Sequence, residues 1–173
     1  LQDISIITKH EKQKLLYTFN ETTLNYSKDK YIIQYFEDIV KEKPNYPALI
    51  FNHSRLTYKQ LNEKANSLAY QLRKKGLKNN DIVGILVPRS FEMMISILAV
   101  LKSGASYIPI DPDYPTERIN YMLDNSKTSL LLSIPSLIEK GNYSVEYIDI
   151  SLTNNNIYNN NKENLKNIST PKD

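Results

Sequence analysis

The sequence contains no cysteine among its 173 residues. Disulfide bonds and thiolate metal sites are therefore excluded, because both need cysteine sulfur. The chain also has no long hydrophobic run, since the most apolar stretch, around 93–101, is too short to cross a bilayer. Residues 1–14 have no apolar core behind a basic start, so we expect no signal peptide. A cytoplasmic protein without a membrane partner is the expectation.

Glycine is scarce, and its four residues are far apart in the sequence: Gly76, Gly84, Gly104 and Gly141. A phosphate-binding loop needs closely spaced glycines, so that several backbone N–H groups can approach the anion. None of the four positions can form such a loop. We therefore expect no nucleotide cofactor site built from these residues alone.

Groups that could carry chemistry are few. The two histidines, His10 and His53, have no second ligand or triad partner nearby, so we interpret His10 as an exposed first-turn residue and His53 as a turn residue. Asp111, Asp113 and Glu117 form an acidic cluster that could hold a metal or act in acid/base chemistry. A structural role explains them better, because aspartate favours turns and glutamate favours the positive N-terminus of a helix. We predict no catalytic, cofactor-binding or metal-binding residue here.

Charge points to no special partner either. The net charge is +3, from 22 basic and 19 acidic side chains, with no dense block of lysine and arginine. The 13 tyrosines are not interleaved with arginine in the manner of a nucleic-acid-binding surface. We expect no nucleic-acid partner.

Hydrophobic patterning favours an α/β fold. Residues 82–87 form an apolar run typical of a strand buried on both faces of a parallel sheet. Helical patterns alternate with the other apolar segments, and this order favours a mostly parallel sheet with flanking helices. The strands are predicted at 48–51, 81–88, 107–110, 129–133 and 145–150. A turn at 52–53 leads into a further short strand at 55–57. Residues 154–167 are rich in asparagine, lysine and glutamate, which predicts a loop or disordered tail.

Two helix starts carry the capping-box pattern of threonine followed three residues later by glutamate or glutamine. Thr8 with Glu11 predicts one, and Thr57 with Gln60 predicts the other. The first helix should carry Leu15, Leu16 and Phe19 on one side. The second should bury a longer apolar stripe and end at Gly76, with Leu77 folding back on Leu72. The predicted stripe consists of Leu61, Ala65, Leu68, Ala69 and Leu72.

Two blocks resemble core motifs of a known family. Residues 56–66, Leu-Thr-Tyr-Lys-Gln-Leu-Asn-Glu-Lys-Ala-Asn, are similar to the first core motif of adenylation domains in nonribosomal peptide synthetases. Residues 101–112, Leu-Lys-Ser-Gly-Ala-Ser-Tyr-Ile-Pro-Ile-Asp-Pro, resemble the second motif, and Tyr-Pro-Thr-Glu-Arg-Ile at 114–119 resembles its continuation. Ser103 stands where the family usually has alanine.

This resemblance implies an incomplete N-terminal portion of an adenylate-forming, luciferase-like large subdomain. Residues 1–27 look like the end of a condensation domain and an interdomain linker, and residues 28–153 like the start of the adenylation domain. Residues 154–173 look like an Asn-rich loop leading to a phosphate-binding motif further on. The expectation is therefore a fragment that stops before the catalytic motifs.

The family's chemistry, as the resemblance implies it, is amino-acid activation. The parent protein would condense an amino acid with ATP and Mg²⁺ to an aminoacyl-adenylate, and load it on the phosphopantetheine of a carrier domain. Its partners would be an upstream condensation domain, the remainder of the adenylation domain and the carrier domain. The fragment alone is predicted to be inactive, with Lys102 and Arg118 attracting ATP only loosely as exposed charges.

Two alternatives stay open on sequence alone. Another adenylate-forming enzyme of the acyl-CoA ligase type would share the fold. A non-catalytic α/β scaffold domain would share it as well, because fold does not fix function. The residues beyond Asp173 would distinguish these alternatives.

Overall fold

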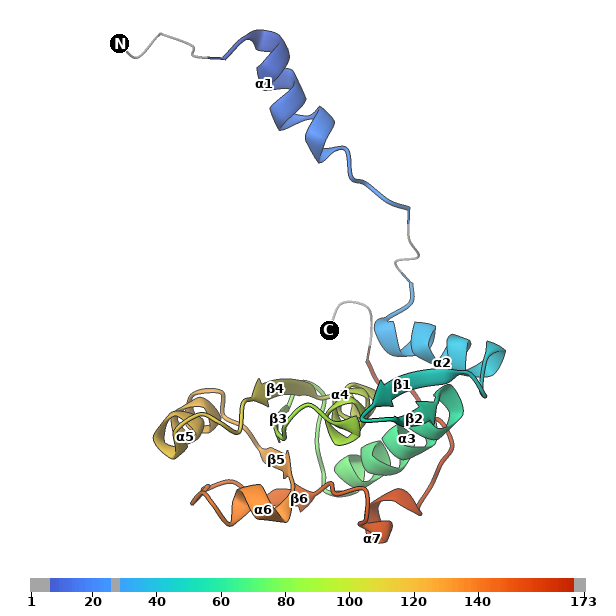
Figure 1. Cartoon of the computed structure of the whole chain (residues 1–173), viewed down its shortest axis with the longest axis vertical. Helices are drawn as coiled ribbons and strands as arrows, with labels where there is room; N and C mark the ends of the chain where they lie inside the picture. Colours follow the sequence, from blue (N-terminus) through green and yellow to red (C-terminus); the bar gives the residue numbers. More distant parts are fainter. Residues whose placement is uncertain (1–6, 26–28, 170–173) are drawn as a thin grey trace.

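The structure, a computed structural model, describes residues 7–25 and 29–169 (Figure 1). Its centre is a four-stranded sheet in the order β4-β3-β5-β6, and every pairing in it is parallel. The predicted α/β class with a parallel sheet is therefore confirmed. The strands are β3 (Ile82–Leu86), β4 (Ser106–Ile110), β5 (Leu130–Ser133) and β6 (Tyr147–Asp149).

The central strand β3 is apolar on both sides, as its sequence predicts. Val83 and Ile85 belong to one buried cluster, and Leu86 belongs to a second cluster on the other face of the sheet. Gly84 lets Leu131 and Leu123 pack directly against the backbone of β3, because a Cβ atom there would lie 2.8 Å from Leu131 Cδ1 and 3.2 Å from Leu123 Cδ2. Both faces of the sheet are thus covered, as parallel sheets require.

Helices cover the two faces in separate layers. On one face, α3 (Tyr58–Lys74) and α4 (Phe91–Ser103) pack with the larger cluster. On the other, α5 (Thr116–Asn125) contributes Ile119 and Leu123, and α6 (Pro135–Ile138) adds Ile138. The chain therefore winds from one face of the sheet to the other as it passes from α4 through β4 to α5 (Figure 1).

One predicted strand lies outside the parallel sheet. The segment expected at 48–51 forms β1 (Pro47–Phe51), which pairs antiparallel with β2 (Ser54–Thr57) in a separate two-stranded sheet. The expectation that it joins the parallel sheet is wrong. The two-residue turn explains the pairing, because Asn52 and His53 both take positive φ angles, 45° and 63°, which suit a tight hairpin.

The helix ends follow their local signals. The predicted capping boxes are confirmed at α1 (Lys9–Leu16) and at α3, where Gln60 N–H donates to Thr57 Oγ1 at 3.2 Å. At the other end of α3, Gly76 has φ 87° and Leu77 N–H donates to the Leu72 carbonyl at 3.4 Å, which is the predicted Schellman arrangement. Pro115 is the N-cap of α5, directly before the helix begins.

The termini of the described chain are built differently. In the N-terminal part, α1 is followed by a short 3-10 helix, η1 (Thr18–Asn20), and none of their residues is buried. Helix α2 (Ile32–Glu42) buries Ile33. At the other end, α7 (Asn155–Tyr158) buries Tyr158, whose hydroxyl donates to the Ile150 carbonyl at 2.7 Å. Of the loop or disordered tail predicted at 154–167, the loop is present from residue 159 on, whereas residues 155–158 form a short helix instead.

Candidate functional site

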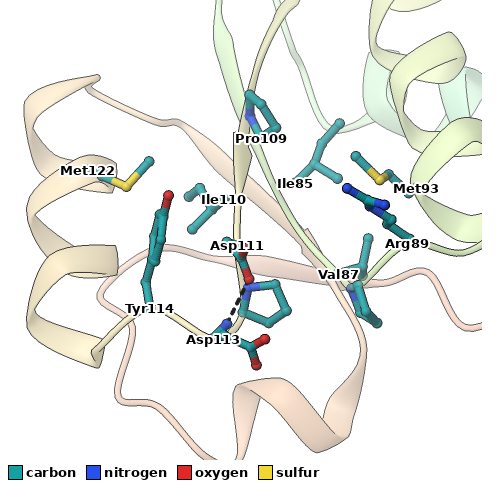
Figure 2. A pocket seen from close by; sticks show the side chains of 12 residues that line it. Ile85, Val87, Arg89, Met93, Pro109, Ile110, Asp111, Asp113, Tyr114 and Met122 are labelled. Carbon is teal, nitrogen blue, oxygen red and sulfur yellow. Dashed lines mark hydrogen bonds between the residues drawn. The ribbon is translucent and has the colours of Figure 1, made fainter.

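The winding of the chain opens a crevice between β3 and β4. The loop after β3 leads to α4 on one face of the sheet, while the loop after β4 leads to α5 on the opposite face. When the loops after two adjacent parallel strands lead to opposite faces of the sheet, a crevice forms at the carboxyl ends of the strands. α/β proteins bind ligands in such crevices. A cavity of about 450 Å³ lies there (Figure 2). It is lined by Ile85, Val87, Pro88, Arg89, Met93, Pro109, Ile110, Asp111, Pro112, Asp113, Tyr114 and Met122.

The lining combines apolar walls with a few polar groups. Arg89 and Met93 lie on one side of the cavity, and Tyr114 and Met122 lie on the other (Figure 2). The exposed Arg89 contributes a positive charge to this site. Such an arrangement suits a ligand, or a further stretch of protein, with both apolar and charged parts.

The carboxylate of Asp111 already has a structural task. It accepts a hydrogen bond from the backbone N–H of Asp113 at 3.0 Å, and the Tyr114 N–H donates to the Asp111 carbonyl at 3.2 Å (Figure 2). The turn also places the Arg118 guanidinium 4.3 Å from the centre of the Tyr114 ring. These contacts favour the interpretation of Asp111 and Asp113 as turn residues.

The other candidate residues stand apart from this cavity. His10 and His53 are both exposed, in α1 and in the β1–β2 turn. Glu117 lies in the first turn of α5, where the helix dipole favours a carboxylate. Within residues 7–25 and 29–169, no group of three histidine, aspartate or glutamate side chains is placed to hold a metal ion.

Lys102 differs from its expected role. Its side chain is only 2% exposed and forms an ion pair with Glu37, which fastens α2 to α4. Burial lowers the pKa of Lys102, and the hydrogen bond that Lys102 donates to Glu37 opposes that shift. The expectation of an exposed charge that attracts ATP is therefore wrong for Lys102, whereas Arg118 is exposed as predicted.

Sequence reasoning overlooked Arg89, Met93 and Met122 as residues that line one cavity. The position of Arg89 directly after the central strand was the available signal, since loops at the carboxyl ends of strands form ligand sites. The methionines gave none, because each also fits an ordinary buried helix face. No helix among the described residues is long and apolar enough to span a membrane.

Comparison with known proteins shows the family to which this chain belongs. A family model described as "AMP-binding enzyme" matches residues 36–171, and the chain therefore belongs to the AMP-binding enzyme family. Its relatives include peptide synthetases. Bacitracin synthase 1 of Bacillus licheniformis is 43% identical over 150 residues, covering 87% of this chain and 3% of that protein. Bacitracin synthase 2 of the same organism is 40% identical over 173 residues, covering 100% of this chain and 6% of that protein.

Solved structures of peptide synthetases have the same fold as this chain. The N-terminal subdomain of Klebsiella oxytoca NpsA superposes with a TM-score of 0.68 and 26% identity, covering 82% of this chain and 35% of that one. The nonribosomal peptide synthetase FmoA3 gives a TM-score of 0.84 over 94% of this chain and 18% of that one, and at 19% identity it supports the fold alone. The resemblance to peptide-synthetase adenylation domains is thus confirmed. The chain spans only a few per cent of the curated relatives it matches.

Proposed function

We propose that these residues are part of the amino-acid adenylation domain of a nonribosomal peptide synthetase. The protein that contains them would join an amino-acid carboxylate to the α-phosphate of ATP, releasing pyrophosphate and leaving an aminoacyl-adenylate. It would then pass the acyl group to a phosphopantetheine thiol on a carrier domain. An upstream condensation domain, the rest of the adenylation domain and the carrier domain would be its partners.

One observation carries this proposal. The alignment with bacitracin synthase 2, 40% identical overall, covers all 173 residues, including residues 1–35 that lie outside the match to the AMP-binding family model. An acyl-CoA ligase would share the AMP-binding region but gives no reason for the shared leader. A further relative in structure, 26% identical with a TM-score of 0.66, is described as a four-domain nonribosomal peptide synthetase bound to AMP and glycine.

These residues contribute architecture to the proposed chemistry. Adenylation needs preorganised N–H donors and cations around the phosphates. The four glycines are at least eight positions apart (76 to 84), so no nest of backbone N–H groups for a triphosphate can form from them. Because this chain does not fit the phosphates of ATP or their Mg²⁺, we assign it no step of the reaction. Catalytic, cofactor-binding and metal-binding residues are proposed to lie elsewhere in the protein.

Pyrophosphate exchange by the longer protein that contains these residues tests the proposal. ATP-dependent exchange with one amino acid, or a small set of similar ones, is the expected result. Exchange with fatty or aryl acids and none with amino acids would favour the acyl-CoA ligase alternative. No exchange with any acid, by a protein shown to be folded, would favour a non-catalytic scaffold.

A further inference from the structure

Two asparagines of the first core motif have no role in the helix cap. Asn62 and Asn66 lie one turn apart on α3 and are 7% and 0% exposed. Asparagine is a poor helix former, and burying a carboxamide costs free energy unless it is hydrogen-bonded. Their side-chain oxygens find no partner among the described residues. The bonds that their amide groups donate are therefore the interactions that offset this cost.

Both amides donate to one distant segment. Asn62 Nδ2 and Asn66 Nδ2 lie 2.8 Å and 2.9 Å from Asn164 Oδ1, so the two share a single acceptor. Asn66 Nδ2 also donates to the Lys162 carbonyl at 2.8 Å. Next to them, Ser67 Oγ lies 3.2 Å from the Asn161 carbonyl and is itself fully buried.

Arg73 extends this row of donors by two turns. Its Nη1 donates to the Lys166 carbonyl at 2.8 Å, and its Nη2 donates to the Lys102 carbonyl at 2.8 Å. The same guanidinium thus joins the segment to the last turn of α4. Positions 62, 66 and 73 are spaced at four and seven residues, so they share one face of the helix.

The spacings of helix and segment match. From Asn66 to Arg73 the helix rises about 10 Å, and the four residue steps from Lys162 to Lys166 span about 13 Å when extended. Lys162 and Lys166 can therefore reach Asn66 and Arg73, while the side chain of Asn164 between them reaches back to Asn62. Leu165 packs on the main apolar cluster between the polar contacts.

The segment ends at the amino edge of the parallel sheet. Ile168 packs against Gly104, where an added Cβ would lie 2.7 Å from Ile168 Cδ1, and Ser169 Oγ is 3.4 Å from Asn79 Oδ1. Gly104 comes two residues before β4 begins. Gly104 therefore lies near the amino ends of the strands, opposite the carboxyl ends where the cavity lies.

We propose that Asn62, Asn66 and Arg73 are positioning residues that dock residues 160–167 on α3 and so fix where the chain reaches the amino edge of the parallel sheet. This rests in part on the proposed function, because the following chain is the part in which the phosphate-binding motif is expected. The first core motif then has a second task besides helix capping: it holds the approach to the phosphate site in place.

The test compares hydrogen exchange with catalysis in the protein that contains these residues. Asn66→Leu keeps the branching at Cγ, is somewhat larger, and removes the donor. We expect amide exchange in peptides covering 160–167 to rise about tenfold, as loss of one to two hydrogen bonds implies. We expect kcat/KM for ATP in pyrophosphate exchange to fall about tenfold, with the KM for the amino acid unchanged.

Variants at the acceptor keep the test independent of folding. Asn164 is exposed, so Asn164→Leu should fold and reproduce both effects, while Asn164→Asp keeps an acceptor oxygen and should behave as the wild type. Asn120→Leu, on α5, is the matched control and should change neither readout.

Unchanged protection of 160–167 in folded Asn66→Leu and Asn164→Leu overturns the docking. If residues 160–167 lose protection from hydrogen exchange but the kinetics of pyrophosphate exchange stay unchanged, the positioning role is overturned. If the wild-type protein exchanges no pyrophosphate, the proposed function fails, and hydrogen exchange still decides whether the asparagines dock the segment.

Discussion

Helices α1 and α3 begin with the same hydrogen-bonded box and lie in opposite surroundings. In α1, Glu11 N–H donates to Thr8 Oγ1 at 3.2 Å, and in α3 the equivalent bond from Gln60 to Thr57 has the same length. Yet α1 buries no residue, while α3 buries eight. The cap therefore sets where a helix starts, and the apolar stripe decides whether the helix carries the fold.

The largest expected difference lies in that stripe. Leu68 is completely buried in α3, so Leu68→Ala should lower the free energy of unfolding by about 3 kcal/mol through lost burial and the cavity left behind. Leu16 in α1 is 53% exposed, so Leu16→Ala should change the free energy of unfolding by less than about 0.5 kcal/mol. Urea unfolding followed by circular dichroism measures both. Similar losses for the two variants would show that α1 is packed as firmly as α3.

Tyr158 sharpens the comparison, because it joins α7 to α3. The Lys64 ammonium lies 4.8 Å from the centre of its ring, and its hydroxyl donates to the Ile150 carbonyl. Tyr158→Phe should cost about 1.5 kcal/mol near neutral pH, since the buried carbonyl loses its partner. The matched change Tyr17→Phe, at an exposed residue beside α1, should cost almost nothing.

The cost of Tyr158→Phe should also depend on pH. Burial, and to a lesser degree the nearby carboxylates of Glu92 and Asp149, raises the pKa of Tyr158 in the folded protein. Above the ordinary tyrosine pKa of about 10 the unfolded chain loses this proton while the folded chain keeps it, so the wild type loses stability as pH rises. The gap between wild type and variant should therefore shrink as the pH rises through that ordinary value. A constant gap in denaturant melts would contradict a buried hydroxyl.

The smallest effects concern the caps themselves. Thr57→Ala should lower the free energy of unfolding by about 1 kcal/mol, because α3 loses its capping bond and is packed into the core. Thr8→Ala should fray α1 locally and leave the global melt unchanged. We expect Thr57→Ala to have little direct effect on the chemical step of the longer protein. A stable Thr57→Ala variant with abolished pyrophosphate exchange would contradict a purely structural cap.

Local signals predicted most of this fold. The capping boxes, the Schellman end at Gly76 and the apolar run of β3 are properties of a few neighbouring residues, and each lies where it was predicted. The hairpin was missed as a separate sheet because strand partners are chosen by long-range packing. A short apolar strand such as β1 looks the same in either sheet.

The candidate site and the docked segment were harder to predict for the same reason. The polarity of 154–167 indicated a loop or disordered tail, and it gave no sign that Asn164 and Lys162 satisfy buried amides about 100 positions earlier in the chain. Lys102 looked exposed because a lysine usually is, and its partner Glu37 lies 65 positions away. The cavity forms because the helices after β3 and β4 pack on opposite faces of the sheet. The spacing of residues in the sequence does not predict which face each helix covers.

Isothermal titration calorimetry of the 173-residue chain with ATP and Mg²⁺ tests the central claim, that these residues supply the architecture of an adenylating enzyme and not its phosphate site. We expect no saturable binding at micromolar concentrations, because the scattered glycines form no phosphate-binding nest. Saturable micromolar binding would contradict it. Such binding would place a nucleotide contact within the chain, with the turn from Asp111 to Arg118 beside the cavity as the first place to look.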